Sequence, residues 1–181
     1  MRWWALALVP CLASVAQATV LMPLDTAALT ARADRVVLGT VETSQAHWSA
    51  DHKSIYTDVT LRVGKVYKGD ATVGSTIVVR REGGSIDGVG MRVFGAASFT
   101  LGEEVVVFTE RRGDASYTVG MTQGKLRVVL GSDGVKRVAA DLSAVAFVDK
   151  SGALSHDRVA RGPRRLDDFE REVRGYVGNA K

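Results

Sequence analysis

The residues that could carry out chemistry in this chain are few and widely separated. The three histidines, His47, His52 and His156, lack the HExxH spacing of a zinc site, and no serine stands in a G-x-S-x-G nucleophile elbow. Glu103 and Glu104 suggest a catalytic carboxylate pair, but neighbouring residues of a strand point to opposite faces and cannot share one substrate. The sequence therefore predicts no catalytic residue, no metal ligand and no cofactor. The enzymatic alternative is a hydrolase with a dispersed Ser/His/Asp set.

A glycine-rich segment over residues 83–102 is the main candidate for a binding site. Its Gly88-Val89-Gly90 tripeptide lacks the Gly-Lys-Ser/Thr ending and the βαβ context of a phosphate-binding loop, so its glycines indicate tight turns. A loop-rich stretch of about twenty residues in a small domain is often where binding happens. The candidate binding residues are the polar and aromatic side chains of this region: Arg80, Arg81, Ser85, Arg92 and Phe94.

The first eighteen residues have the composition of a secretory signal peptide. Arg2 precedes an apolar run over residues 3–15, and Ala16-Gln17-Ala18 is a small-x-small cleavage site. Pro10 interrupts the run, which is shorter than the about 20 apolar residues of a membrane-spanning helix. We therefore expect residues 1–18 to be cleaved, the protein to be periplasmic or secreted, and no membrane span. The single cysteine, Cys11, would leave with the signal peptide, so the exported chain would have neither disulfide nor thiol.

Residues 19–181 have the pattern of one mainly β domain. Asp25 can cap a short helix over residues 26–31. Apolar and polar residues alternate over 55–63, and a change of phase past Gly64 predicts a β-bulge that curls this strand. The continuous apolar run of residues 105–108 predicts a central strand over residues 104–109 that is covered on both faces. Other short strands are expected over residues 36–41, 76–80, 116–121, 125–130, 135–139 and 144–148, with an exposed hairpin connection over 43–53.

The C-terminal residues 166–178 predict an amphipathic helix that docks on the sheet. Its apolar stripe consists of Leu166, Phe169, Val173 and Val177, and Asp167 with Glu170 could form a capping box. The expected fold is a small curled β-barrel with a short N-terminal helix and this C-terminal helix.

The charge pattern gives little support to a nucleic-acid partner. The formal net charge is +4, and acidic and basic residues interleave. The densest basic patch is Arg158, Arg161, Arg164 and Arg165, which we interpret as a solvated linker. The aromatic residues that could stack on bases are scattered over separate segments: Trp48, Tyr56, Tyr67 and Tyr117.

Three stretches resemble the opening of netrin-like domains and of tissue inhibitors of metalloproteinases. They are Ala33-Asp34-Arg35-Val36-Val37-Leu38-Gly39-Thr40-Val41, Ile55-Tyr56-Thr57, and Val63 through Val66-Tyr67-Lys68-Gly69. The likeness covers residues 33–69, extends loosely to Phe108, and is shared with a group of uncharacterised exported bacterial proteins. It implies a β-barrel of the oligomer-binding type with helices packed against it.

The inhibitors in that family begin with a cysteine whose amine and carbonyl chelate the zinc of the protease. In this chain, cleavage after Ala18 would place Thr19 and Val20 at that position, without a disulfide to hold them. We expect an exported, non-enzymatic binding module whose partner is another exported or envelope protein. One alternative is an inhibitor of a secreted metalloprotease that acts through Thr19 and Val20. Another is a barrel that binds an anionic glycan or nucleic acid.

Overall fold

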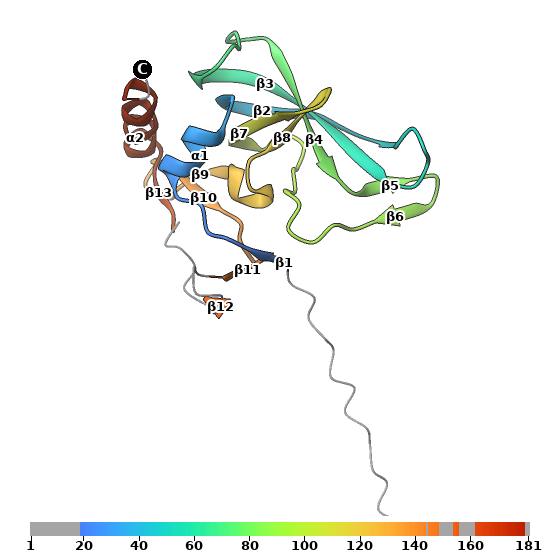
Figure 1. The fold of residues 1–181 in the computed structure, drawn as a ribbon. Coiled ribbons are helices and arrows are strands. Elements are labelled where there is room, and N and C mark those ends of the chain that lie inside the picture. Colours follow the sequence, from blue (N-terminus) through green and yellow to red (C-terminus); the bar gives the residue numbers. More distant parts are fainter. Residues whose placement is uncertain (1–18, 144, 149–153, 156–161, 180–181) are drawn as a thin grey trace, which may run out of the picture.

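The computed structural model describes residues 19–143, 145–148, 154–155 and 162–179, and it is mainly β-structure with two helices. The predicted signal peptide, His156, Arg158 and Arg161 lie outside the described residues. Both helices, α1 (Thr26–Arg32) and α2 (Leu166–Gly178), lie on one side of the main sheet (Figure 1). The prediction of a mainly β fold with one short N-terminal and one C-terminal helix is confirmed.

The main sheet has the strand order β13-β10-β9-β7-β2-β3-β4, and every pairing in it is antiparallel. An eighth strand, β8, pairs with the end of β7 beside the position of β9. The strands are β2 (Arg35–Trp48), β3 (Ile55–Lys68), β4 (Thr76–Glu82), β7 (Glu104–Arg112), β8 (Ala115–Thr118), β9 (Lys125–Leu130), β10 (Lys136–Ala140) and β13 (Arg164–Arg165).

The expected curled barrel does not close among the described residues, because the two strands that would close it do not pair. The sheet curls until β8 lies beside β4, yet no ladder of backbone hydrogen bonds joins them among the described residues. Charged side chains meet across this seam instead, Arg80 with Asp114 and Arg112 with Glu82, each pair at 3.8 Å. The fold is therefore a curled open sheet.

Three β-bulges account for the curl of the long β2–β3 hairpin. The register passes from Leu38 opposite Lys65 to Gly39 opposite Val63, so Gly64 is the extra residue, as the sequence predicted. The same reading of the register places further bulges at Tyr67 and Glu42. Because each bulge adds local twist, the hairpin wraps around its own apolar face.

The connection between these strands is shorter than predicted. The polar residues 43–48 belong to β2, where they pair residue by residue with the regular strand β3, and the turn begins at Ser49. The prediction was wrong because neither face of this part of β2 is fully buried: residues 43–45 are exposed and residues 46–48 are partly buried, so the stretch carries no apolar alternation that would signal a strand.

Two apolar cores lie on opposite faces of β2 and β7. Successive residues of β7 alternate between them, and Val105 to Phe108 are all fully buried, which confirms the predicted central strand. The core beneath the helices contains Leu29, Val36, Leu38, Val106, Phe108, Leu126, Phe169 and Val173. The core inside the curl contains Val37, Val41, Val59, Leu61, Val63, Ile77, Val79, Val105 and Val107.

The predicted N-terminal cap is present at α1 and absent at α2. Asp25 caps α1 as predicted, with its carboxylate accepting a hydrogen bond from the Ala28 N–H at 2.7 Å. No side chain caps α2, so the predicted capping box of Asp167 and Glu170 is wrong. The Glu170 carboxylate accepts hydrogen bonds from Lys65 and Tyr67 of β3 instead, and these bonds fasten α2 to the sheet.

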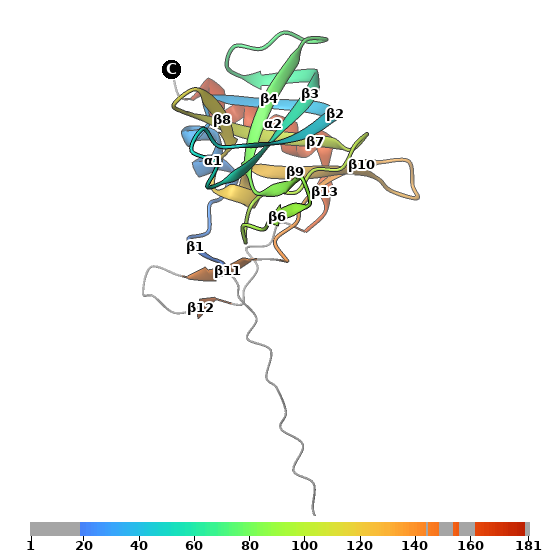
Figure 2. The ribbon, with the colours of Figure 1, turned by 90° about the vertical axis from the view of Figure 1, so that its right-hand side faces the viewer.

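Two small sheets complete the fold. Strand β1 (Thr19–Leu21) pairs in parallel with β11 (Val145–Val148), which also pairs with β12 (Leu154–Ser155). Figure 2 shows this sheet below the main one. Strands β5 (Gly84–Ile86) and β6 (Val89–Met91) form a hairpin within the glycine-rich segment. Neither helix in the described part of the chain has the length and apolarity to cross a membrane.

The close approach of β2 and β3 requires glycine at position 39. A Cβ atom at Gly39 would lie 2.7 Å from the Arg62 carbonyl oxygen, whereas one at Gly64 would lie 3.6 Å from its nearest neighbour, the Leu38 carbonyl oxygen. We predict that Gly39→Ala lowers the free energy of unfolding by about 1–3 kcal/mol, because the backbone must shift. Gly64→Ala should change it by less than about 0.5 kcal/mol. Urea unfolding of both variants measures the difference, and equal losses would contradict the steric explanation.

Candidate functional site

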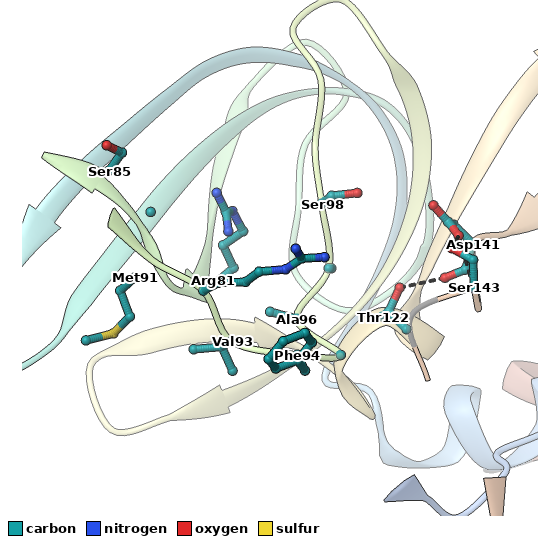
Figure 3. A pocket seen from close by; sticks show the side chains of 14 residues that line it. Arg81, Ser85, Met91, Val93, Phe94, Ala96, Ser98, Thr122, Asp141 and Ser143 are labelled. Atoms are coloured by element: carbon teal, nitrogen blue, oxygen red, sulfur yellow. Dashed lines mark hydrogen bonds between the residues drawn. The ribbon is translucent and has the colours of Figure 1, made fainter. Parts of the chain in front are cut away.

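A pocket of about 520 Å³ lies where the glycine-rich segment meets the end of β4. Its wall includes Arg81 at the end of β4, Ser85 and Met91 of the β5–β6 hairpin, and residues 92–98 of the following loop. The opposite wall consists of Thr122, Asp141 and Ser143 (Figure 3). Segments that are far apart in the sequence therefore meet around one hollow.

The N-terminal strand is attached directly to the loop of this pocket. The Thr19 hydroxyl donates a hydrogen bond to the Phe94 carbonyl at 2.7 Å, and Thr19 pairs with Val145 in the β1–β11 ladder. Gly95 has a φ of +82°, and a Cβ atom there would lie 3.3 Å from atoms of both Thr19 and Val145. The sequence predicted two separate binding segments, and the structure joins them.

Arg81 is the charged residue that β4 contributes to the pocket lining. Ile77, Val79 and Arg81 alternate along β4 on the face that lines the curl, and the first two are buried in its core. Burial lowers the pKa of the Arg81 guanidinium. The guanidinium donates a hydrogen bond to the Glu82 carbonyl at 3.4 Å, and no carboxylate of the described residues forms an ion pair with it.

Arg80 points the other way and is not part of the pocket. It forms two hydrogen bonds to the Asp58 carboxylate, at 2.7 and 2.9 Å, on the outer face of the sheet. These bonds hold the pKa of Asp58 below its usual range. The Tyr56 ring lies 5.9 Å from Arg80, and the Tyr117 hydroxyl of β8 also interacts with it. Two of the four scattered aromatic residues thus meet here, around a cation that is already paired.

The other predicted residues lie at or beside the pocket. Arg92 packs over the Phe94 ring, with 5.1 Å between the guanidinium carbon and the ring centroid. Ser85 is exposed on the β5–β6 hairpin and lines the pocket. Val20, in contrast, is outside the pocket lining and 52% exposed on β1.

Sequence reasoning missed the wall formed by Thr122, Asp141 and Ser143. The Thr122 hydroxyl donates to the Asp141 carbonyl at 2.9 Å, and the Ser143 hydroxyl donates to the Asp141 carboxylate at 2.7 Å. Hydrogen bonds from Ser143 lower the pKa of Asp141. The Asp-x-Ser spacing of Asp141 and Ser143 signals a local turn. It does not show that this turn lies beside the loop of residues 92–98, because the tertiary fold brings the two segments together.

A buried ion pair fastens the far end of the glycine-rich segment. The Lys125 ammonium, whose side chain is 3% exposed, donates to Glu103 at 2.6 Å and lies 5.4 Å from the centroid of the Phe99 ring. Arg127 and the Thr100 N–H donate to the same carboxylate. Glu104 binds Lys136 instead, so the two adjacent glutamates diverge as expected.

The histidines of the described part of the chain lie at the far end of the β2–β3 hairpin. His47 Nε2 is 3.3 Å from the Asp58 carboxylate, and His52 stacks on Trp48 with ring centroids 6.0 Å apart. No group of three or more His, Cys, Asp or Glu residues that could hold a metal ion occurs among the residues that the structure describes.

The Glu103–Lys125 pair makes stability depend on pH in a defined direction. Burial alone would raise the pKa of Glu103, but hydrogen bonds from Lys125, Thr100 and Arg127 outweigh it, and the pKa is lowered. The carboxylate therefore stabilises the fold above its unfolded pKa of about 4.3, and this contribution is lost as the pH falls through the lower folded value.

We predict that Glu103→Gln lowers the free energy of unfolding at pH 7 by about 3 kcal/mol, because Lys125 is left buried without a counter-charge. The difference from wild type should shrink below about pH 4.3. Adding Lys125→Met should recover part of the loss. Chemical unfolding between pH 3 and 7 measures both effects, and a difference independent of pH would show that Glu103 does not act through its charge.

Comparisons of the chain with protein-family models, with curated proteins and with solved structures found no match. The function must therefore be inferred from the geometry of the pocket and of β1.

Proposed function

We propose that this protein is an exported, non-enzymatic binding module whose partner is another exported or envelope protein. The partner binds the β1 surface, which we define as Thr19, Val20 and Met22 together with the adjoining residues 92–98. The single observation that carries this proposal is the hydrogen bond from Thr19 to the Phe94 carbonyl, which joins the two predicted binding segments beside the pocket. The proposal includes an oligomer-binding-type, netrin-like ancestry, with which a curled sheet and two packed helices agree.

The β1 surface has the composition expected of a protein-binding site. Val20 and Met22 are 52% and 63% exposed, although both are apolar. Neighbouring exposed apolar side chains are typical of protein interfaces. Thr19 is held by its strand pairing and its hydroxyl, so the partner meets an ordered surface.

An anionic polymer is a weaker candidate because many basic side chains of the main sheet already have acidic partners. These pairs are Arg62 with Glu42, Lys65 with Glu170, Arg80 with Asp58, Lys136 with Glu104, and Arg137 with Asp133. Phosphate binding depends on cations that are free to replace condensed counterions, and paired cations contribute little to it. The charge pattern of the described residues thus favours a protein over a nucleic acid or an anionic glycan.

The test begins with a photo-crosslinking amino acid that replaces Met22 in the chain expressed by the producing cells. The control is a chain with the same crosslinker at position 130. Leu130 is apolar and 70% exposed, but it lies on β9, away from β1. A protein captured at position 22 and not at position 130 is then purified, and its affinity for the exported chain is measured by calorimetry.

We predict that Val20→Asp with Met22→Asp weakens this affinity by about tenfold or more, because carboxylates would be desolvated in an apolar contact. Leu130→Asp should leave it within about twofold, as expected for a residue outside the contact. Equal capture at both positions, or unchanged affinity of the double variant, would refute the proposal.

A further inference from the structure

Arg81 occupies a position where the strand pattern requires an apolar side chain. It follows Ile77 and Val79 on the inner face of β4, and it pairs in register with the buried Thr57 of β3. A guanidinium at the end of a core is costly unless a counter-charge or water satisfies it. Arg81 is partly buried, lines the pocket and forms no ion pair within the described residues. Apart from the weak bond to the Glu82 carbonyl, its N–H donors are therefore available to a ligand in the pocket.

The charge of the pocket selects the kind of anion. Arg81 and Arg92 line it together with one acid, Asp141, so the lining has one net positive charge. The Asp141 carboxylate already accepts two hydrogen bonds from Ser143, and it remains ionised at neutral pH. The two negative charges of a dianion such as phosphate exceed the single net positive charge of the lining, whereas a monoanion balances it.

The apolar part of the pocket wall determines which kind of chemical group can accompany the anion. Met91, Val93, Phe94, Ala96 and Ala97 give this side of the pocket an apolar surface. The volume of about 520 Å³ lies within the range of small-molecule sites and accommodates one or two amino-acid residues.

We infer that this pocket binds a monoanionic carboxylate attached to an apolar group, as presented by the C-terminal residue of a polypeptide. Arg81 donates two parallel N–H bonds to the carboxylate, which is the geometry that a guanidinium offers best. The apolar side chain packs on Phe94 and its neighbours. Small aliphatic acids share this chemistry, and the choice of a peptide end over them rests on the proposed protein partner.

The experiment compares three probes by NMR titration of the purified exported protein. They are N-acetyl-alanyl-leucine, the C-terminal amide of the same dipeptide, and isovalerate. We expect the dipeptide acid to shift the amide signals of Gly95, Ala97 and Thr122. The affinity of the dipeptide amide should be lower by about tenfold or more, because the amide has no negative charge to pair with Arg81. Equal binding of acid and amide, or no binding of either acid, would overturn the inference.

Arg81 variants separate ligand binding from folding. Arg81→Gln should abolish binding of the acid, while Arg81→Lys should retain a fraction of it, since the charge remains and the paired donors are lost. The matched control is Arg111→Gln, which makes the same charge change at an exposed residue of β7 and should bind as wild type. The melting temperature of Arg81→Gln should be unchanged or higher, because a partly buried cation without a counter-charge is removed. Full binding by Arg81→Gln, or a melting temperature that falls together with binding in Arg81→Lys, would indicate a purely structural arginine.

The isovalerate arm separates this inference from the proposed function. If isovalerate binds as tightly as the dipeptide acid and crosslinking at position 22 captures no protein, the pocket is a carboxylate site for small acids and the protein-binding proposal fails. If a captured protein binds equally well after amidation of its C-terminus, the partner stands and the carboxylate inference fails for it.

Discussion

The structure depends on one constraint, which is that β2 and β7 are apolar on both faces. Val36, Leu38, Val106 and Phe108 face the helices, and Val37, Val41, Val105 and Val107 face the curl. Burying only one of these faces would leave the other in water, at a cost of about 25 cal/mol for each Å² of apolar surface. The helices satisfy one face, and the bulged β2–β3 hairpin with β4 must wrap around the other. The curl is therefore a consequence of burial, and its open end is where the pocket forms.

The glycine-rich segment makes the pocket because it is fastened at both ends and in the middle. Thr57 donates to the Gly83 carbonyl where the segment begins, Thr19 holds Phe94, and Glu103 is locked by Lys125 where the segment ends. Each contact uses a residue of a different strand, Thr57 of β3, Thr19 of β1 and Lys125 of β9, so the loop is positioned by the main sheet together with the small β1–β11 sheet. A loop held in this way has little conformational entropy left to lose, which makes the pocket a preformed one.

Local patterns in the sequence predicted most of the elements but not their meeting points. The alternation over 55–63, the apolar run of residues 105–108 and the stripe of residues 166–178 correspond to β3, β7 and α2 because each pattern reports burial directly. The length of β2, the approach of β8 to β4 and the place of Asp141 depend on tertiary contacts, which leave no local signal. Glu170 shows the same limit, since its spacing suited a capping box but Tyr67 and Lys65 compete for its carboxylate.

Arg80 and Arg81 show that the two-residue period of a strand can assign candidate side chains to the two faces of the sheet from the sequence. Both were candidates by residue type, and the phase set by Ile77 and Val79 already assigns Arg81 to the inner face and Arg80 to the outer one. The outer arginine finds Asp58 directly across the sheet, so its charge is neutralised within the fold. The inner arginine faces a strand position occupied by a threonine, which offers no counter-charge. The binding function that we propose rests on this departure from the apolar pattern. Where the core inside the curl ends, the chain places a cation instead of another valine, and the proposed ligand supplies the negative charge that the fold does not.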